Sequence, residues 1–211
     1  MDSWNENKTK LAKSLYYSGC IKFGDFVSKS GMTSPIYIDL RAIISFPQLL
    51  KRVAKEYIAI LDNLHFDKIV AIPHTALPIG TAICLENNVP MIYPRKETQV
   101  YGTKASFEGI YYKGEKVVIV DDLVASGDSI YETLDKINEA ELVVKDVVVL
   151  IDRESGGCDR LTRDGYNLHY IFKLKELLNY WKTERLISTV TYLMANNFLL
   201  SSGTNAKCKL Y

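Results

Sequence analysis

The sequence predicts a single α/β domain in which helices cover both faces of a mostly parallel sheet. The first observation is that short runs rich in Val and Ile alternate with longer segments of helical period. The second is size, because 211 residues with 47% hydrophobic content fall in the range of one domain. Strands that alternate with helices lie side by side in one sheet, and ligands bind at the carboxyl ends of those strands.

The strands are predicted from four short runs that charged or turn residues bound on either side. Val and Ile dominate these runs, which is typical of strands buried on both faces. They span residues 68–73, 89–93, 117–120 and 146–151. Residues 94–114 fit neither periodicity, and a polar stretch of this length inside a domain is more often a functional flap than a passive link.

The helices are predicted from apolar residues at three-and-four spacing. Residues 47–63 form an amphipathic pattern, with Pro47 suited to its first turn. Residues 76–87 and 128–140 predict two more helices, and helical period returns over 174–199. The remaining residues are expected to form a frayed tail.

Composition limits the possible partners. The 26 Lys and Arg nearly cancel the 25 Asp and Glu, so nothing global favours a nucleic acid or a membrane. The polar N-terminus lacks an apolar leader, and no apolar run approaches the ~18 residues of a membrane span. The four widely spaced cysteines form no CxxC pair, which favours free thiols in a reducing compartment. A soluble, cytoplasmic protein is expected.

The stretch VVIVDDLVASGDS at 117–129 places two acids directly after a buried strand and before a turn of small residues. Backbone N–H groups in that turn, with the positive end of the next helix, would suit a phosphate monoester. Asp121 and Asp122 could then accept hydrogen bonds from sugar hydroxyls. Alternatively, the acids simply cap the turn.

This stretch resembles the phosphoribosyl pyrophosphate signature of the type I phosphoribosyltransferases. Other stretches make the chain similar to the orotate phosphoribosyltransferases, particularly the form in bifunctional UMP synthase, over roughly residues 11–200. They are KSGMTSPIYIDLR at 29–41, IPHTALPIGTAI at 72–83, RKETQVYGTK at 95–104 and IDRESGG at 151–157. The resemblance implies one domain of the type I phosphoribosyltransferase fold: a small N-terminal hood (1–45), a core (46–173) with a mobile catalytic loop, a helical segment (174–199) and a tail (200–211).

The resemblance also implies an activity, the transfer of phosphoribosyl from phosphoribosyl pyrophosphate (PRPP) to orotate. The products are orotidine 5′-phosphate and pyrophosphate, formed in de novo pyrimidine synthesis. The oxocarbenium-like transition state needs negative groups beside the ribose and positive groups beside the leaving pyrophosphate. The implied ribose and 5′-phosphate contacts are Asp121, Asp122, Leu123, Val124, Ala125, Ser126, Gly127, Asp128 and Ser129.

Cationic and loop residues are implied around the pyrophosphate. Mg²⁺ is the expected cofactor, held mainly by substrate oxygens and water, so no protein ligand for it is assigned. The implied catalytic groups on the protein are Asp121 and Asp122 with the loop residues Lys96 and Lys104. The implied pyrophosphate contacts are His74, Thr75, Ala76, Arg95, Lys96 and Lys29. Because the family's loop reaches into the neighbouring subunit, a homodimer is expected. His74 could instead be an ordinary turn residue, and the loop cations could be solvated.

Arg153 matches the family's orotate-binding arginine, and a guanidinium fork suits a planar carboxylate. Its alternative role is a salt bridge to Asp152 or Glu154. Lys29 and Tyr37 correspond to hood residues near the base, although Tyr37 could equally pack in the core.

Two departures from the family keep other functions open. Gln99 stands where the family's loop carries a second lysine, whose role Lys104 could take, and Asp128 stands where a hydroxyl residue is usual. Asp128 could cap the following helix, and Ala125 leaves the backbone amides available. The alternatives are a phosphoribosyltransferase for another base and a regulator that binds PRPP or a nucleotide with weakened turnover. The chain is expected to be a transferase without an attached decarboxylase.

Overall fold

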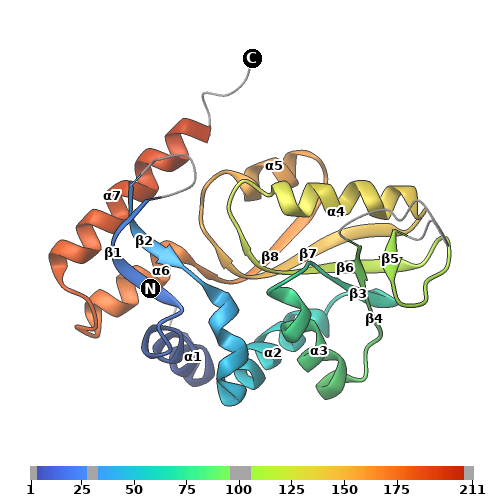
Figure 1. The fold of residues 1–211 in the computed structure, drawn as a ribbon, viewed down its shortest axis with the longest axis horizontal. Helices are drawn as coiled ribbons and strands as arrows, with labels where there is room; N and C mark the ends of the chain where they lie inside the picture. Colours follow the sequence, from blue (N-terminus) through green and yellow to red (C-terminus); the bar gives the residue numbers. More distant parts are fainter. Residues whose placement is uncertain (1–3, 28–32, 96–105, 207–211) are drawn as a thin grey trace.

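The computed structural model of the chain describes residues 4–27, 33–95 and 106–206, with side chains to residue 201. Figure 1 shows a central sheet with helices on both faces and a smaller sheet beside it. The predicted α/β class, with a mostly parallel sheet between helices, is confirmed.

The central sheet has six strands in the order β5-β4-β3-β6-β7-β8. Neighbours are parallel except β4 and β5, which are antiparallel. The four predicted runs are all strands, whereas β5 and β8 were not predicted. The bounds are β3 (Lys68–Ala71), β4 (Met91–Pro94), β5 (Phe107–Glu108), β6 (Lys116–Val124), β7 (Val143–Asp152) and β8 (Asn167–Lys173).

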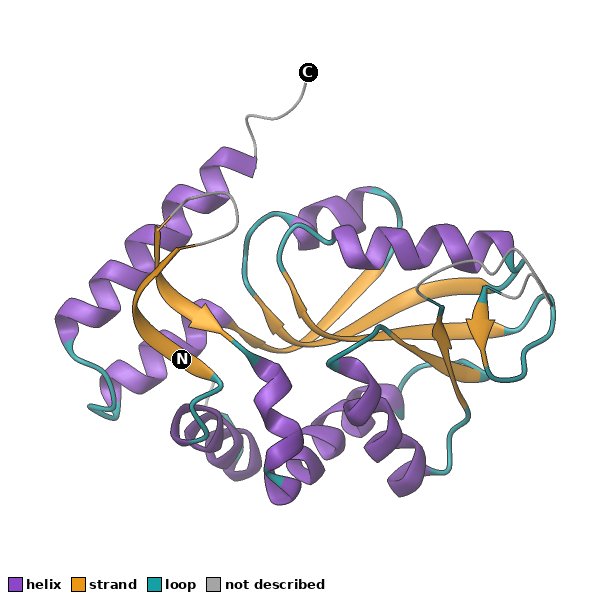
Figure 2. Cartoon of the chain, in the orientation of Figure 1, coloured by secondary structure: helices purple, strands orange, loops and turns teal. Residues whose placement is uncertain are grey.

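Side chains that alternate along the strands build a separate core on each face of the sheet. Along β3, Ile69 and Ala71 enter one core, while Val70 and the following Ile72 enter the other. Figure 2 shows helices below the sheet and above it. The lower helices are α2 (Pro47–Leu61) and α3 (Ala76–Asn87), and the upper ones are α4 (Asp128–Glu139) and α5 (Gly157–Arg163).

The hood contains a two-stranded antiparallel sheet that packs against the C-terminal helices. Trp181, in one of these helices, is fully buried and donates its Nε1–H to the carbonyl of Ala12 at 3.0 Å. The last helix packs against β2 and continues to Ala206, past the expected start of the tail at residue 200. The hood elements are α1 (Glu6–Tyr17), β1 (Ile21–Val27), β2 (Thr33–Ile38) and the 3-10 helix Leu40–Ser45, and the C-terminal helices beside them are α6 (Leu174–Thr183) and α7 (Thr189–Ala206).

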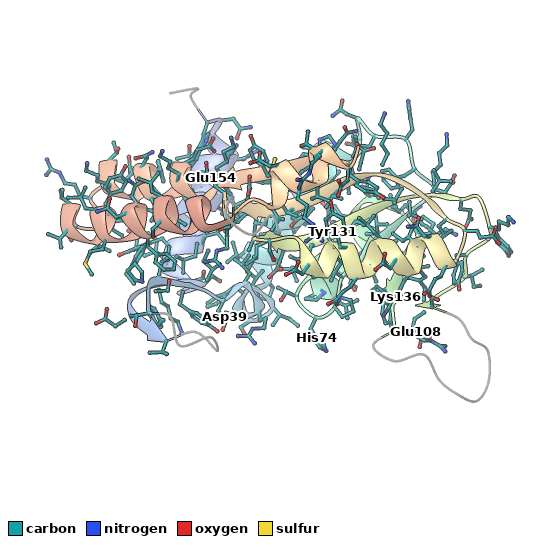
Figure 3. All side chains as sticks on the ribbon, turned by 90° about the horizontal axis from the view of Figure 1, so that it is seen from above. Asp39, His74, Glu108, Tyr131, Lys136 and Glu154 are labelled. Carbon is teal, nitrogen blue, oxygen red and sulfur yellow. The ribbon has the colours of Figure 1, made fainter. Side chains whose placement is uncertain are left out.

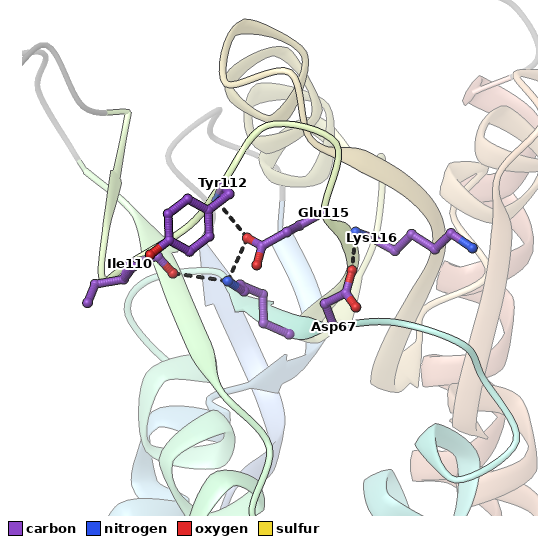
Figure 4. Close-up of polar contacts among 6 residues, drawn as sticks. Asp67, Ile110, Tyr112, Glu115 and Lys116 are labelled. Atoms are coloured by element: carbon purple, nitrogen blue, oxygen red, sulfur yellow. Dashed lines mark hydrogen bonds and ion pairs between the residues drawn. The ribbon is translucent and has the colours of Figure 1, made fainter.

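The connection between β5 and β6 is fixed at the amino end of the sheet. Figure 4 shows the buried Lys68 ammonium donating to the Ile110 carbonyl at 3.1 Å and to the Glu115 carboxylate at 2.6 Å. Glu115 also accepts the Tyr112 N–H at 2.7 Å, and Asp67 accepts the Lys116 N–H at 2.7 Å. Lys68 therefore satisfies its buried charge within the fold, at the end of the sheet away from the expected ligands.

The strand order reverses between β3 and β6. From β3 the chain moves outward to β4, and it later returns to the other side of β3 as β6. Open α/β sheets bind ligands at such a switch point, beyond the carboxyl ends of the two strands. The segments that follow β3 and β6 are therefore the first candidates for the site. None of the helices in the described part of the chain is long and apolar enough to cross a bilayer.

Candidate active site

The paired acids lie within β6 rather than after it. The strand was predicted to end at Val120, but its ladder with β7 continues to the pair formed by Val124 and Asp152. The Asp121 side chain is buried and accepts the Asp122 N–H at 2.9 Å and the Ser129 hydroxyl at 3.1 Å. Asp122 is half-buried and accepts the Leu123 N–H at 2.9 Å. The strand thus holds both carboxylates rigidly at the carboxyl edge of the sheet.

The environment of the pair disfavours its charged form. Burial raises the pKa of Asp121 well above its ordinary 3.8, and the neighbouring Asp122 carboxylate raises that pKa further. Burial also raises the pKa of Asp122, while hydrogen bonds, including one with the Thr75 hydroxyl, act in the opposite direction. Groups that donate hydrogen bonds to the pair, such as ribose hydroxyls, would offset the cost of keeping two adjacent carboxylates ionised.

A tyrosine from α2 supports the pair from beneath. The fully buried Tyr57 donates its hydroxyl to the Asp121 carbonyl at 2.6 Å. The sequence showed Tyr57 only as part of an apolar helix face, so its hydrogen bond across the core could not be predicted. The contact ties α2 to the strand at the residue that carries the buried carboxylate.

The small-residue turn after β6 leads into α4, as predicted. Gly127 has a φ of 87° and is the N-cap of α4, and Asp128 is its first residue. Because the first residues of a helix have no acceptor within it, the N–H groups of Asp128, Ser129 and Ile130 are directed to this turn. Such a turn suits an anion, including a phosphate.

The turn itself divides into residues that face solvent and residues that pack. Ser126, Asp128 and Ser129 are exposed, but the Val124 side chain is buried in the upper core. Leu123 packs against the lower core. The side chains of Leu123 and Val124 therefore pack in the protein. Among the implied ribose and phosphate contacts, we ascribe to these two residues backbone roles only.

Asp128 does not cap α4. Its carboxylate accepts the Ser126 hydroxyl at 2.8 Å and the Arg160 guanidinium of α5 at 2.8 Å. The Ser126 hydroxyl and the Arg160 charge hold the pKa of Asp128 below its ordinary 3.8. The residue that fits the family pattern worst is therefore ionised and paired. No spacing in the sequence points to Arg160, because 32 residues separate it from Asp128.

The segment after β7 packs tightly against this turn. The Arg153 N–H donates to the Val124 carbonyl at 2.9 Å, and the Gly157 N–H donates to the Ala125 carbonyl at 2.8 Å. A Cβ on Gly157 would lie 2.6 Å from that carbonyl oxygen and 2.6 Å from Val124 Cγ2. Only glycine fits here, and the glycine pair in IDRESGG was the one sequence signal for such a close approach.

Arg153 is a partly buried cation without a partner in the described part of the chain. Its Nε is buried and has no hydrogen-bond partner, and burial lowers its pKa. Neither alternative salt bridge is formed in the described part of the chain; Asp152 accepts the Glu154 N–H at 2.8 Å, and Glu154 accepts the Lys175 N–H at 3.2 Å. A half-buried guanidinium in this state is suited to an anionic ligand.

The segment after β3 carries His74, Thr75 and Ala76 next to the acids. β3 and β6 pair up to Ala71 and Val120, so the two carboxyl ends adjoin. His74 is exposed, and its peptide bond with Pro73 is cis. Ala76 is fully buried in the lower core, which leaves only its backbone for a ligand. Figure 3 shows His74 on the same side of the molecule as Asp39 of the hood and Glu108 of β5.

Arg95 forms structural contacts at the base of the loop that was expected to be catalytic. Its N–H donates to the Ser106 carbonyl at 3.0 Å, and its Nε and one Nη lie 2.8 and 3.3 Å from the two Glu108 carboxylate oxygens. Lys136 of α4 donates to the Arg95 carbonyl and lies near Glu108 in Figure 3. Arg95 therefore has its charge neutralised by Glu108. Four loop and hood residues lie outside the described residues: Lys29, Lys96, Gln99 and Lys104.

Tyr37 lies on the hood surface and not in its core. Its side chain is 39% exposed, stacks on Phe26 with 5.4 Å between ring centroids, and accepts a hydrogen bond from Arg41 at 3.1 Å. The alternative role of Tyr37, packing in the core, is thus limited to its contact with the Phe26 ring. In the described part of the chain no three His, Cys, Asp or Glu residues gather as metal ligands.

Comparisons with known proteins fit this geometry. A family model for the phosphoribosyl transferase domain matches residues 40–165, which include the segments after β3 and β6. The orotate phosphoribosyltransferase of Caenorhabditis elegans is 38% identical over 174 residues, covering 82% of this chain and 77% of that protein. The chain belongs to the orotate phosphoribosyltransferase family. The resemblance drawn from the motifs is thereby confirmed.

The chain also matches part of two larger proteins. The structure of UMP synthase of Leishmania donovani superimposes with a TM-score of 0.85 at 42% identity, covering 92% of this chain and 42% of that one. A bifunctional PyrF/PyrE enzyme of Nostoc is 46% identical over 167 residues, covering 79% of this chain and 35% of that protein. The chain thus spans about two fifths or less of these two relatives.

Proposed function

We propose that the chain is an orotate phosphoribosyltransferase that converts PRPP and orotate to orotidine 5′-phosphate and pyrophosphate in de novo pyrimidine synthesis. The observation that carries this proposal is the position of Arg153. A partly buried guanidinium without a partner among the described residues is joined through its backbone to the turn that follows Asp121 and Asp122. In the proposal, the ribose site and the site for the orotate carboxylate would therefore adjoin.

The acids and the turn would hold the phosphoribosyl group. Asp121 and Asp122 accept the ribose hydroxyls, and their charge stabilises the oxocarbenium character that develops on the ring. The N–H groups at the start of α4 receive the 5′-phosphate, with Ser126 and Ser129 beside them. This arrangement would fix the anomeric carbon relative to the sheet, so that the base can attack it from one side while pyrophosphate leaves from the other.

The pyrophosphate would lie against the segment after β3. The backbone of His74, Thr75 and Ala76 offers N–H groups there, and the proposal assigns the cationic contacts to Lys29, Lys96 and Lys104. Mg²⁺ belongs to the proposal as a partner of the pyrophosphate, where it offsets charge on the leaving oxygens. The half-buried carboxylate of Asp122 could accept hydrogen bonds from water molecules bound to such an ion.

Orotate would bind with its carboxylate on the Arg153 fork and its ring towards the hood. Tyr37 presents an exposed, stacked ring on β2 that suits the edge of a planar base. A phosphoribosyltransferase for an uncharged base would have no use for a partly buried, unpaired arginine, which costs folding free energy.

We also propose a homodimer that works in the cytoplasm. The dimer follows from the family's shared loop, and the free cysteines Cys20, Cys84 and Cys158 suit a reducing compartment. A second candidate function is a regulator with weak turnover. It is favoured by Gln99 in place of the loop lysine and by Arg95, whose charge is committed to Glu108.

A panel of bases tests the proposal. The chain is incubated with PRPP, Mg²⁺ and either orotate, uracil, adenine or hypoxanthine, and loss of the base is followed by absorbance. Consumption of orotate alone is expected. Preferred consumption of another base would overturn the assignment, and binding of PRPP and orotate without consumption, unchanged in Gln99→Lys, would favour the regulator.

A further inference from the structure

Asp128 raises a problem that the proposed function does not solve. A carboxylate occupies the first turn of α4, and its side chain is 72% exposed, beside the N–H groups that would receive the 5′-phosphate. A phosphate monoester carries nearly two negative charges at neutral pH. An unshielded carboxylate at this place would repel it, so the site needs a compensating positive charge.

Arg160 supplies that charge from the neighbouring helix. Its Nη1 lies 2.8 Å from Asp128 Oδ1, while the Ser126 hydroxyl donates to Asp128 Oδ2 at 2.8 Å. Both carboxylate oxygens are thus engaged. The same carboxylate orients Ser126, so the ion pair also sets the position of a hydroxyl within the turn.

Arg160 is itself held in place by contacts that are independent of Asp128. Its guanidinium carbon lies 3.7 Å from the centre of the Tyr131 ring, a cation–π contact, and the Tyr131 hydroxyl donates to Asp164. Figure 3 places Tyr131 on α4, near the middle of the molecule. The start of α5 is fixed in addition by the hydrogen bond from Gly157 to Ala125. The guanidinium is therefore ordered at the edge of the turn before any ligand arrives.

We propose that Arg160 is a positioning residue of the 5′-phosphate site, which neutralises Asp128 and fixes it against Ser126 so that the turn accepts a dianion. This inference rests on the proposed function and names a residue that the family signature does not contain. Arg160 acts through Asp128. The ion pair of Asp128 and Arg160 would take the place of the neutral hydroxyl residue that the family uses, with the same net charge of zero.

A double-mutant cycle tests the inference. Arg160→Ala is expected to raise the KM for PRPP on the order of tenfold with little change in kcat. Without Arg160 the Asp128 carboxylate would repel the 5′-phosphate dianion, and solvent limits this repulsion to about 1 kcal/mol per pair of charges at 4 Å. In an Asp128→Asn background the same substitution is expected to change the KM less than twofold. Arg160→Lys, which keeps the charge, is expected to recover most of the affinity. Arg163→Ala, on the same helix and exposed, is the matched control and should leave the KM unchanged.

The competing explanation is that Arg160 merely packs α5 against α4. It predicts an equal rise of KM in both backgrounds, and that result would overturn the inference, as would an unchanged KM in Arg160→Ala. Calorimetric binding of ribose 5-phosphate to the same variants separates this inference from the proposed function. Coupling between Arg160 and Asp128 in ribose 5-phosphate binding, without any turnover of orotate, would support the phosphate site while the transferase proposal fails.

Discussion

Replacing Arg153 by Met separates binding from folding at the proposed orotate site. The substitution keeps a long, flexible side chain and removes the guanidinium. Its backbone N–H, which donates to the Val124 carbonyl at 2.9 Å, is retained, so the segment after β7 should keep its place. Any change in catalysis can then be assigned to the lost fork.

The magnitude follows from the state of the guanidinium in the free protein. A bidentate contact with the orotate carboxylate contains two charge-assisted hydrogen bonds, each worth about 1.5 kcal/mol or more. Their loss, about 3 kcal/mol, corresponds to roughly a 100-fold fall in kcat/KM for orotate. Because the buried Nε has no partner among the described residues, part of its desolvation cost is already present without ligand. Stability should therefore not fall in Arg153→Met, and a gain of about 1 kcal/mol is expected.

Steady-state kinetics with varied orotate, together with urea unfolding, measure both quantities on one preparation. Arg163→Met, an exposed arginine on α5, is the control and should change neither. An unchanged kcat/KM with a lower free energy of unfolding would refute the reasoning, because Arg153 would then be a structural cation. Arg153→Lys should recover only part of the rate, since an ammonium lacks the planar fork.

Three further predictions concern the phosphoribosyl site and the loop. Asp121→Asn should abolish most activity yet raise the melting temperature at neutral pH. Because the pKa of Asp121 is raised in the folded protein, its contribution to stability is fully present below the ordinary value of 3.8 and is lost as the pH rises. The gain in melting temperature should therefore vanish near pH 4, and a gain that is equal at all pH values would contradict this reasoning. Gly157→Ala should lower the free energy of unfolding by about 1–3 kcal/mol and raise the KM for PRPP, since its Cβ would displace the Ala125 carbonyl, and an unchanged KM would argue against a shared turn. Gln99→Lys should raise kcat by up to about 100-fold, while Gln48→Lys on α2 should not; equal rates in both would remove the loop from the explanation.

The sequence predicted the sheet well because its central strands are buried on both faces. A strand of this kind is a continuous apolar run, as in residues 117–120, and needs no knowledge of its neighbours. The extension of β6 through Asp121 and Asp122 was missed because acids are rare in strands, and only pairing with β7 holds them there. The hood strands were missed for a related reason. β1 contains Gly24 and Asp25 and is half exposed, so its pattern is not strand-like without its partner.

The site divides in the same way. The acids, the turn and Arg153 belong to short contiguous motifs, so a resemblance could identify them. The contacts of Tyr57 with Asp121 and of Arg160 with Asp128 join residues 64 and 32 positions apart, and no local pattern encodes them. Arg95 belongs to such a motif as well, but the motif did not indicate its ion pair with Glu108 at the base of the loop.

The most direct test of the account is to follow phosphorus resonances while the chain acts on PRPP, orotate and Mg²⁺. The account predicts that the PRPP signals are replaced, one for one, by those of orotidine 5′-phosphate and pyrophosphate, and only when orotate is present. Unchanged PRPP, or its hydrolysis to ribose 5-phosphate without loss of orotate, would contradict it.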